Sequence, residues 1–232
     1  MDLVRASHLY KVFGKNERQV IERLKAGESR EELASLGTAA VIDVSFEVAK
    51  GETFVVMGLS GSGKSTLIRM INGLWSPSEG TVEVAGKVVS GMNDAQMRAL
   101  RRDHVSMVFQ HFALLPHLTV RENAAYGLKL QGKLKQKERL EKANEWLNTV
   151  GLNGWGDKYP HQLSGGMQQR VGLARALAAE TDILLMDEAF SALDPLIRRE
   201  MQDQLLELQG ALNKTIIFIT HDLNEAMYLG DH

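Results

Sequence analysis

The sequence predicts an α/β fold, in which a core with a mixed, largely parallel sheet carries an antiparallel β subdomain and an inserted α-helical subdomain. Short apolar runs rich in β-branched residues alternate with longer amphipathic stretches, as in parallel strands that helices connect. One further run alternates strictly between apolar and polar residues, which is typical of an antiparallel strand with one wet face. A polar stretch from about 120 to 160 has helical character and no strand signal. We expect a single domain over residues 1–232.

The strands of the core are expected where the chain is almost continuously apolar, since strands covered on both faces have that pattern. These segments are 53–57, 104–109, 183–187 and 215–220. The alternating run is 40–48, in which Ile42, Val44, Phe46 and Val48 would share one face. We expect this strand to pair with a strand at 81–84.

Helix starts are marked by capping residues. Asp194 before Pro195 predicts an N-cap followed by proline at the first helical position. Two further pairs have capping-box spacing, Thr119 with Glu122 and Asp222 with Glu225.

Two segments interrupt the core. Residues 14–38 form an insertion with two short helical patterns, divided by Gly27 and restarted by Ser29 with Glu32. Residues from about 111 to 165 are expected to form the helical subdomain.

The composition narrows the possible functions. The 232 residues carry a net charge of -2, which disfavours a dedicated nucleic-acid binder. The sequence has no cysteine, so disulfides and thiolate metal sites are excluded. The N-terminus has no secretion-signal pattern, and the longest apolar runs are far shorter than the roughly 20 residues that span a bilayer. A role at a membrane would therefore depend on partner proteins.

The stretch "GLSGSGKST" at 58–66 matches the phosphate-binding loop of P-loop NTPases. It directly follows the strand at 53–57 and directly precedes a helical segment, which is the context that the motif requires. Glycines let successive backbone N–H groups surround phosphates, and the helix N-terminus adds partial positive charge. Lys64 would hold the β and γ phosphates of ATP, and Ser65 would bind Mg²⁺. The other expected phosphate-binding residues are Gly58, Ser60, Gly61, Ser62, Gly63 and Thr66.

The stretch "ILLMDE" at 183–188 ends an apolar strand with two carboxylates. Ligands of open α/β sheets bind at the carboxyl ends of strands, so Asp187 is suited to the Mg²⁺ shell. Glu188 would orient and deprotonate the attacking water. The alternative is that both residues cap a helix, which the phosphate loop makes less attractive.

A second glycine-containing helix start follows in "LSGGMQQR" at 163–170. The exposed amides at Ser164, Gly165 and Gly166 would form a second anion site. Because the first loop already surrounds the phosphates of one ATP, the second site would serve the γ-phosphate of a nucleotide held by another copy. Two copies arranged head to tail would then enclose two ATP molecules. From the residues alone, a tight helix entry explains the glycines equally well.

"LSGGMQQR" resembles the signature sequence of the ABC ATPases, and the other elements of that family follow in order along the whole chain. Gln110 resembles the glutamine that reaches Mg²⁺ and the attacking water, and His221 resembles the switch histidine that contacts the γ-phosphate. "SALD" at 191–194 resembles the loop that crosses the dimer interface. Phe13 matches the aromatic position that stacks on adenine, with Tyr10 as the second candidate.

Three stretches narrow the resemblance to the ATPase subunits of importers for glycine betaine, proline betaine and choline. They are the insertion at 14–38, the stretch 109–123 and the run 184–202, in which "DEAF" replaces the more widespread "DEP". The resemblance implies an ATP-dependent homodimer, transmembrane permease partners and, indirectly, a substrate-binding protein, with no nucleic acid. It also implies a peripheral position on the cytoplasmic face of the inner membrane. Since the family normally continues beyond the switch histidine and its helix, the end at "YLGDH" indicates a truncated C-terminal part.

Three alternatives remain at this stage. The chain could serve another ABC importer, for an amino acid, nitrate or sulfonate, because no residue here would touch the solute. It could be a soluble ABC ATPase acting on nucleic acid or ribosomes, although it lacks long coiled-coil insertions, a second ATPase domain and a basic surface. A phosphoryl-transfer kinase would have no use for "LSGGMQQR".

Overall fold

The structure, a computed structural model, describes residues 2–191 and 193–231. The chain forms two compact units. The first consists of Met1–Lys50 with Val56–Met97, and the second of Gly51–Val55 with Arg98–His232.

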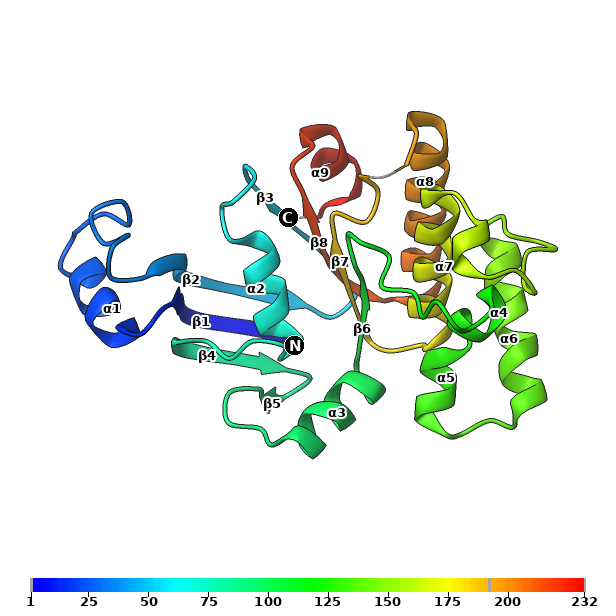
Figure 1. The fold of residues 1–232 in the computed structure, drawn as a ribbon, viewed down its shortest axis with the longest axis horizontal. Coiled ribbons are helices and arrows are strands. Elements are labelled where there is room, and N and C mark those ends of the chain that lie inside the picture. Colours follow the sequence, from blue (N-terminus) through cyan, green and yellow to red (C-terminus); the bar gives the residue numbers. More distant parts are fainter. Residues whose placement is uncertain (1, 192, 232) are drawn as a thin grey trace. The chain divides into compact units, whose positions relative to one another are not determined.

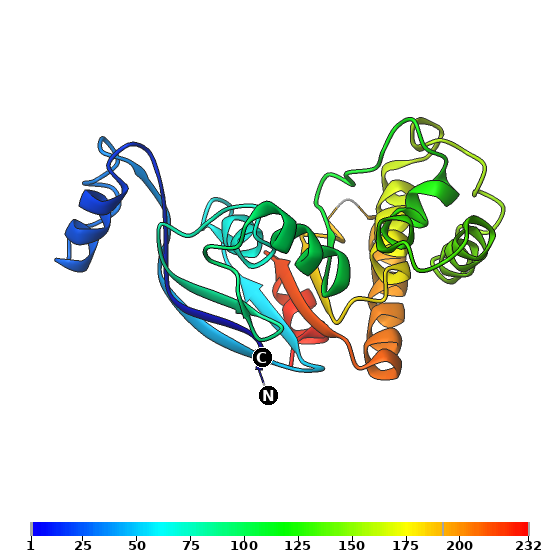
Figure 2. The ribbon, with the colours of Figure 1, turned by 90° about the horizontal axis from the view of Figure 1, so that it is seen from below.

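The first unit contains a four-stranded antiparallel sheet with the order β2-β1-β4-β5. Its strands are β1 (Asp2–Phe13), β2 (Thr38–Ala49), β4 (Glu79–Val84) and β5 (Lys87–Val88). Helix α2 (Lys64–Ile71) contacts β2 and β4, and its Leu67, Ile68, Met70 and Ile71 are buried. Helix α1 (Glu17–Lys25) lies at the far end of the β1–β2 ribbon (Figure 2).

The pairing predicted between 40–48 and 81–84 is wrong. Strand β1 lies between β2 and β4 and pairs antiparallel with both. Its buried residues Val4, Ala6, Leu9 and Val12 do not alternate regularly, because register shifts interrupt the pairing with β2. Because of this irregularity, β1 lacks the regular alternation of apolar and polar residues from which an antiparallel strand is predicted.

The inward face predicted for β2 is confirmed at Val44, Phe46 and Val48, which are buried or partly buried, and is wrong at Ile42. The register of β1 against β2 shifts between the pairs Leu9–Val44 and Lys11–Val41, and Asp43 has a left-handed φ of 48°. This bulge changes the side-chain phase. Val41 is therefore buried, whereas Ile42 is 38% exposed.

The insertion contains one helix, and the prediction of a second is wrong. Residues 30–36 form turns. The expected capping contacts are nevertheless made, since Glu32 accepts hydrogen bonds from the backbone and side chain of Ser29 at 2.8 Å each. A segment this short gains little from helix propagation, and burial of Leu33 against Tyr10 and Val20 holds it instead.

A second sheet has the strand order β3-β8-β7-β6, and all of it except Val56 and Met57 of β3 belongs to the second unit. The strands are β3 (Thr53–Met57), β8 (Thr215–Thr220), β7 (Ile183–Asp187) and β6 (Val105–Val108). All four were expected from the sequence, although β6 is shorter than 104–109. Strands β6, β7 and β8 run parallel, and every residue of β7 and β8 is buried, which explains their unbroken apolar character.

Helices pack around this sheet and beside it (Figure 1). They are α3 (Asp94–Asp103), α4 (Val120–Ala124), α5 (Tyr126–Gln131), α6 (Gln136–Thr149), a 3-10 turn (Pro160–Gln162), α7 (Gly165–Ala178), α8 (Pro195–Leu212) and α9 (Leu223–Leu229). Helices α4, α6 and α7 contact one another. Residues 150–159, expected within the helical stretch, form turns and irregular structure. Side chains from α7, β7, β8 and α8 form the core, among them Val171, Leu177, Leu184, Met186, Phe218 and Leu205.

The predicted helix caps are confirmed with one exception. Asp194 accepts a hydrogen bond from the Ile197 N–H at 3.1 Å. The reciprocal box of Thr119 and Glu122 is present at α4. Asp222 caps α9 through Asn224, but Glu225 does not return a bond to it, so this second box is wrong. The Glu225 carboxylate is buried and instead accepts hydrogen bonds from Gln202 and Thr220.

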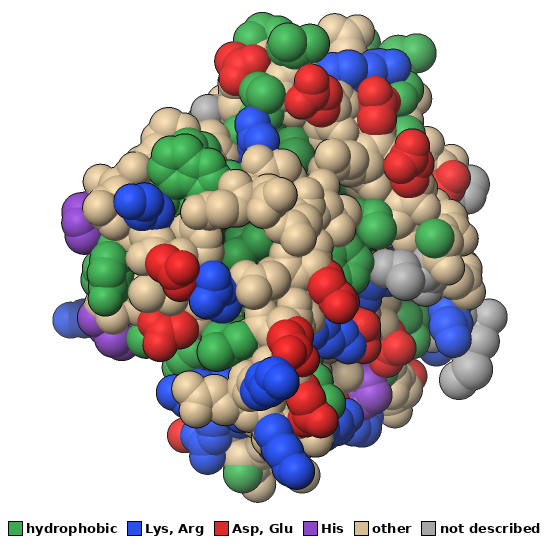
Figure 3. All heavy atoms as spheres, turned by 90° about the vertical axis from the view of Figure 1, so that its right-hand side faces the viewer, with side chains coloured by type: hydrophobic (Ala, Val, Ile, Leu, Met, Phe, Trp, Pro, Cys, Tyr) green, Lys and Arg blue, Asp and Glu red, His purple; other side chains and the backbone are tan. Residues whose placement is uncertain are grey.

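Among the described residues, no helix combines the length and apolarity that crossing a bilayer requires. The face of the second unit shown in Figure 3 mixes Lys and Arg with Asp and Glu and carries scattered apolar side chains. That mixture agrees with the balanced charge of the sequence.

Candidate ATP site

The phosphate loop of the first unit has the backbone that its glycines allow. Gly61 and Gly63 have left-handed φ values of 78° and 91°, which residues with a Cβ rarely adopt. A Cβ on Gly63 would also lie 1.9 Å from the carbonyl oxygen of Ala40, and one on Gly58 would lie 2.9 Å from the Ser62 Oγ. Glycine is therefore required at Gly63 by both conformation and space.

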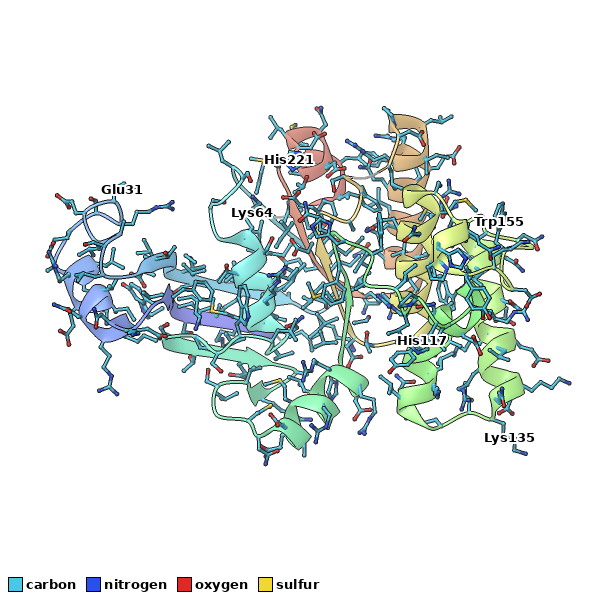
Figure 4. The ribbon with its side chains drawn as sticks, viewed as in Figure 1. Glu31, Lys64, His117, Lys135, Trp155 and His221 are labelled. Atoms are coloured by element: carbon cyan, nitrogen blue, oxygen red, sulfur yellow. The ribbon has the colours of Figure 1, made fainter. Side chains whose placement is uncertain are left out.

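Helix α2 begins at Lys64, within the stretch 58–66, so its first backbone N–H groups face the loop with partial positive charge. Figure 4 shows Lys64 at the start of this helix. Its side chain folds back over the loop, and Nζ donates to the carbonyl oxygens of Gly58 and Leu59 at 2.7 and 2.8 Å. The residue is 7% exposed, so the loop holds a nearly buried cation among backbone groups.

The two candidates for adenine stacking differ in accessibility. Tyr10 is 5% exposed and belongs to the apolar cluster of the insertion. Phe13 is 38% exposed and packs edge to face against Trp75, with ring centroids 5.1 Å apart. Phe13 is thus the more accessible of the two rings, although the Lys11 ammonium lies over it at 5.2 Å from the centroid. Trp75, which was not predicted from the sequence, supports the Phe13 ring. No local sequence signal links these two rings, because 61 intervening residues separate them along the chain.

Three candidate catalytic residues of the second unit converge at one edge of its sheet. Gln110, Glu188 and His221 follow the carboxyl ends of the adjacent strands β6, β7 and β8. Gln110 Nε2 donates to Glu188 Oε2 at 3.1 Å, and His221 Nδ1 lies 3.4 Å from the same oxygen. The parallel pairing explains this convergence. The carboxyl ends of the three strands lie side by side, so the residues that follow them meet at the same edge of the sheet. Figure 4 shows His221 where β8 ends.

The turn after β7 is strained at Glu188. Asp187 is 1% exposed, and Glu188 has a left-handed φ of 47°, which is unfavourable for a residue with a Cβ. The Glu188 N–H donates to the Ile219 carbonyl of β8 at 3.1 Å, and the Glu188 carbonyl accepts from the Ser191 hydroxyl at 2.8 Å. These bonds hold a conformation that aims the carboxylate at Gln110 and His221. The sequence gives no indication of this backbone geometry.

Helix α7 fixes the loop that carries Gln110. Gln169 donates to the Phe109 carbonyl at 3.3 Å, and Arg175 donates to the carbonyls of Ala113 and Phe112 at 2.7 and 3.2 Å. Both Phe112 and Ala113 have left-handed φ values, so Arg175 stabilises a strained turn. Burial lowers the pKa of the Arg175 guanidinium from its ordinary value. Neither Gln169 nor Arg175 was predicted from the sequence to hold this loop, because an arginine in an amphipathic helix is normally assigned to the exposed face.

The start of α7 is exposed at Ser164 and Gly165. Ser164 is the N-cap, and its hydroxyl accepts from the Met167 N–H at 3.3 Å. Gly165 and Gly166 lie in the first turn without left-handed φ values, so the helix entry does not need glycine for its conformation. A Cβ on Gly166 would lie 3.2 Å from the end of the Leu193 side chain.

The candidate residues thus fall into two groups. Phe13 and the loop 58–66 belong to the first unit, and the residues after β6, β7 and β8 belong to the second together with Ser164–Gly166. Within the predicted dimer-crossing loop 191–194, Ala192 lies outside the described residues, Leu193 is buried and Asp194 caps α8.

Known proteins resemble this chain in sequence. The chain is 55% identical over 230 residues to the glycine betaine transport ATP-binding protein OpuAA of Bacillus subtilis (strain 168), which covers 98% of this chain and 55% of the relative. It is 54% identical over 235 residues to the glycine betaine/carnitine transport ATP-binding protein GbuA of Listeria monocytogenes serotype 1/2a (strain 10403S), covering 100% of this chain and 59% of the relative. The chain therefore spans a little more than half the length of these relatives.

A solved structure and a family model agree with this resemblance. The dimeric post-hydrolysis structure of the ATP-binding cassette MJ0796, bound to ADP and Pi, superposes with a TM-score of 0.85 at 32% identity, covering 97% of this chain and 90% of the other. The predicted fold class is thereby confirmed. The model described as ABC transporter matches residues 41–191. This chain, with its phosphate loop, strand-end carboxylates and signature helix, belongs to the ABC transporter family as an ABC ATPase cassette.

Proposed function

We propose that this chain is the ATP-hydrolysing subunit of an importer for a quaternary amine such as glycine betaine, proline betaine or choline. The observation that carries the enzymatic part is the convergence of Gln110 and His221 on the Glu188 carboxylate, at distances of 3.1 and 3.4 Å. Such a cluster at the carboxyl ends of parallel strands is suited to holding one water molecule beside a phosphate.

The loop 58–66 binds the triphosphate of ATP. Its backbone N–H groups and the start of α2 face the phosphate oxygens, and Lys64 Nζ exchanges its two carbonyl partners for oxygens of the β and γ phosphates. Because the ammonium group is already nearly buried, it loses little further solvation when ATP binds.

Hydrolysis uses Glu188 as the general base. The water oxygen attacks the γ-phosphorus, one water proton moves to the Glu188 carboxylate, and the bond to the bridging β-phosphate oxygen breaks to give ADP and phosphate. Gln110 orients the water through its amide, and His221 contacts the γ-phosphate. ADP and phosphate as the sole products would also exclude a kinase.

Ser65, Gln110 and Asp187 are the residues that would hold a magnesium ion. Hydroxyl, amide and carboxylate oxygens are ligands that Mg²⁺ accepts, and Mg²⁺ usually completes its shell with water and substrate phosphates. When bound, the ion would neutralise charge that develops on the phosphate oxygens.

We further propose that two copies act head to tail, with Ser164, Gly165 and Gly166 of one copy contacting the γ-phosphate held by the other. In this arrangement the exposed start of α7 binds the γ-phosphate of the ATP that the loop 58–66 of the other copy holds. The dimer would act from the cytoplasmic face of the inner membrane on permease subunits, which a substrate-binding protein supplies with solute, and nucleic acid has no part.

Substitution of Phe13 by Ala is expected to weaken ATP binding by about 1 to 3 kcal/mol, since stacking of a base on an aromatic ring contributes that much. Calorimetry with ATP measures the change. Tyr10→Ala is the matched control, because it removes a buried ring of the same unit and should lower thermal stability. If Phe13→Ala instead unfolds at lower temperature and binds ATP normally, the ring is structural.

The solute assignment predicts that cells lacking this gene and redundant carriers lose uptake of labelled glycine betaine or choline. Its support is the high identity to relatives named for glycine betaine transport, together with the insertion at 14–38. Uptake of labelled nitrate and an amino acid in the same cells is the control. Normal betaine and choline uptake with loss of another solute would transfer the protein to a different class of importer.

A further inference from the structure

A buried carboxylate beside the candidate site has no part in the chemistry proposed above. Glu225 on α9 is 6% exposed, and its two oxygens have separate partners. We propose that Glu225 is a positioning residue that fixes the switch histidine, His221, against Glu188 and connects it to the start of α8. This inference rests on the proposed ATPase function.

One oxygen of Glu225 anchors the loop that carries His221. Glu225 Oε2 accepts a hydrogen bond from the Thr220 hydroxyl at 2.6 Å, and the same hydroxyl oxygen accepts from the Asp222 N–H at 3.0 Å. Thr220 and Asp222 are the two chain neighbours of His221. The side chain before the histidine is therefore bonded to the carboxylate directly, and the peptide N–H after it is connected to the carboxylate through the Thr220 hydroxyl. These bonds limit how far the His221 ring can move from Glu188.

The other oxygen connects this loop to α8. Glu225 Oε1 accepts from Gln202 Nε2 at 3.1 Å and lies 3.8 Å from Arg198 Nε. Arg198 also lies 3.6 Å from Asp222 and donates to the Leu193 carbonyl at 3.2 Å. Leu193 belongs to the loop 191–194, so the carboxylate joins that loop to the histidine through a continuous set of polar contacts.

Burial makes these contacts consequential. A buried carboxylate that loses a partner leaves a donor or acceptor unsatisfied, so the arrangement has few alternatives. Only a side chain with two acceptor oxygens, such as a carboxylate, can accept hydrogen bonds from the Thr220 hydroxyl and from the donors of α8 at the same time. A change at either end therefore alters the His221 position without altering the phosphate loop.

The test is Glu225→Gln, which keeps the side-chain volume but has one acceptor oxygen instead of two. Its amide nitrogen would face either the Thr220 hydroxyl or the donors of α8. We expect the turnover number of ATP hydrolysis to fall by about 10-fold or more, the effect of losing one charge-assisted hydrogen bond, with KM for ATP unchanged. Tyr228→Phe is the matched control, because it removes another α9 to α8 hydrogen bond, to Asp203, away from the histidine.

A double-mutant cycle separates positioning from general stabilisation. If Glu225 acts through His221, adding Glu225→Gln to His221→Ala causes no further loss, whereas independent effects multiply. Should Glu225→Gln fail to fold, Thr220→Val, which lacks the hydroxyl, is expected to show the same loss and Thr220→Ser to restore hydrolysis.

The outcomes distinguish the two proposals. Wild-type protein that does not hydrolyse ATP would overturn the proposed function and the positioning role together. Active wild type with a normal Glu225→Gln variant, with losses that multiply in the cycle, or with equal activity of Thr220→Val and wild type would overturn the positioning role alone.

Discussion

Replacing Glu188 by Gln is expected to slow ATP hydrolysis by about 10² to 10⁴, the usual contribution of a positioned general acid or base. The amide keeps the size of the side chain and its hydrogen bond with Gln110, but it cannot accept the water proton. Binding of ATP should survive, since the contacts of the phosphate loop are unchanged. Phosphate release and calorimetry on the same preparation measure the two quantities.

Glu180→Gln is the matched control for this variant. Glu180 has the same left-handed backbone, with a φ of 50°, and its exposed carboxylate pairs with Lys142. The same chemical change in the same backbone conformation should leave hydrolysis near the wild-type rate. A Glu188→Gln variant that also retained that rate would remove Glu188 from the role of general base.

Replacing Lys64 by Ala is expected to lower ATP affinity by about 100-fold or more. Lys64 would make charge-assisted contacts to two phosphates, each contributing about 1.5 to 3 kcal/mol. Since every 1.4 kcal/mol changes a dissociation constant tenfold, loss of both contacts gives at least that factor. Calorimetry with ATP measures the change directly.

The Lys64→Ala result needs a stability control, because Lys64 also bonds the Gly58 and Leu59 carbonyls of its own loop. The melting temperature without nucleotide detects any collapse of the loop, and Lys87→Ala tests removal of an exposed lysine from the same unit. ATP affinity equal to that of wild type in a folded Lys64→Ala variant would contradict the assignment.

Features that depend on neighbouring residues could be predicted from the sequence. The phosphate loop is one, because its glycines, its lysine and the start of α2 are contiguous in the chain. Strands β7 and β8 are another, since burial on both faces imposes an unbroken apolar run, whereas β3 and β6 are only partly buried. The N-cap at Asp194 follows in the same way from the residue beside Pro195.

Features that depend on distant partners could not be predicted. The bulge at Asp43 changes the exposed face of β2 through its pairing with β1, which no local pattern records. Glu225 stands at capping-box spacing from Asp222, yet Gln202 on another helix provides a buried partner 23 residues away. The left-handed conformation of Glu188 likewise depends on its bond to β8. In each case a tertiary contact outweighs the local preference.

The nucleotide site proposed between two copies makes a specific prediction for the oligomeric state of the Glu188→Gln variant. Because uncleaved ATP would be held by the loop 58–66 of one copy and by Ser164–Gly166 of the other, the variant should accumulate as a dimer with ATP. ADP lacks the γ-phosphate and should not support that dimer. Gly166→Asp, added to Glu188→Gln, places a carboxylate where the γ-phosphate would bind, and Gly166→Asn adds the same bulk without charge.

Light scattering of these three proteins, each with ATP and with ADP, is therefore the decisive measurement. We expect a dimer for Glu188→Gln with ATP only, weaker dimerisation for the Asn double variant, and a monomer for the Asp double variant, since charge repulsion adds to bulk. A Gly166→Asp double variant that dimerises fully with ATP would show that the glycines of α7 form only a helix entry, and the shared nucleotide site would have to be abandoned.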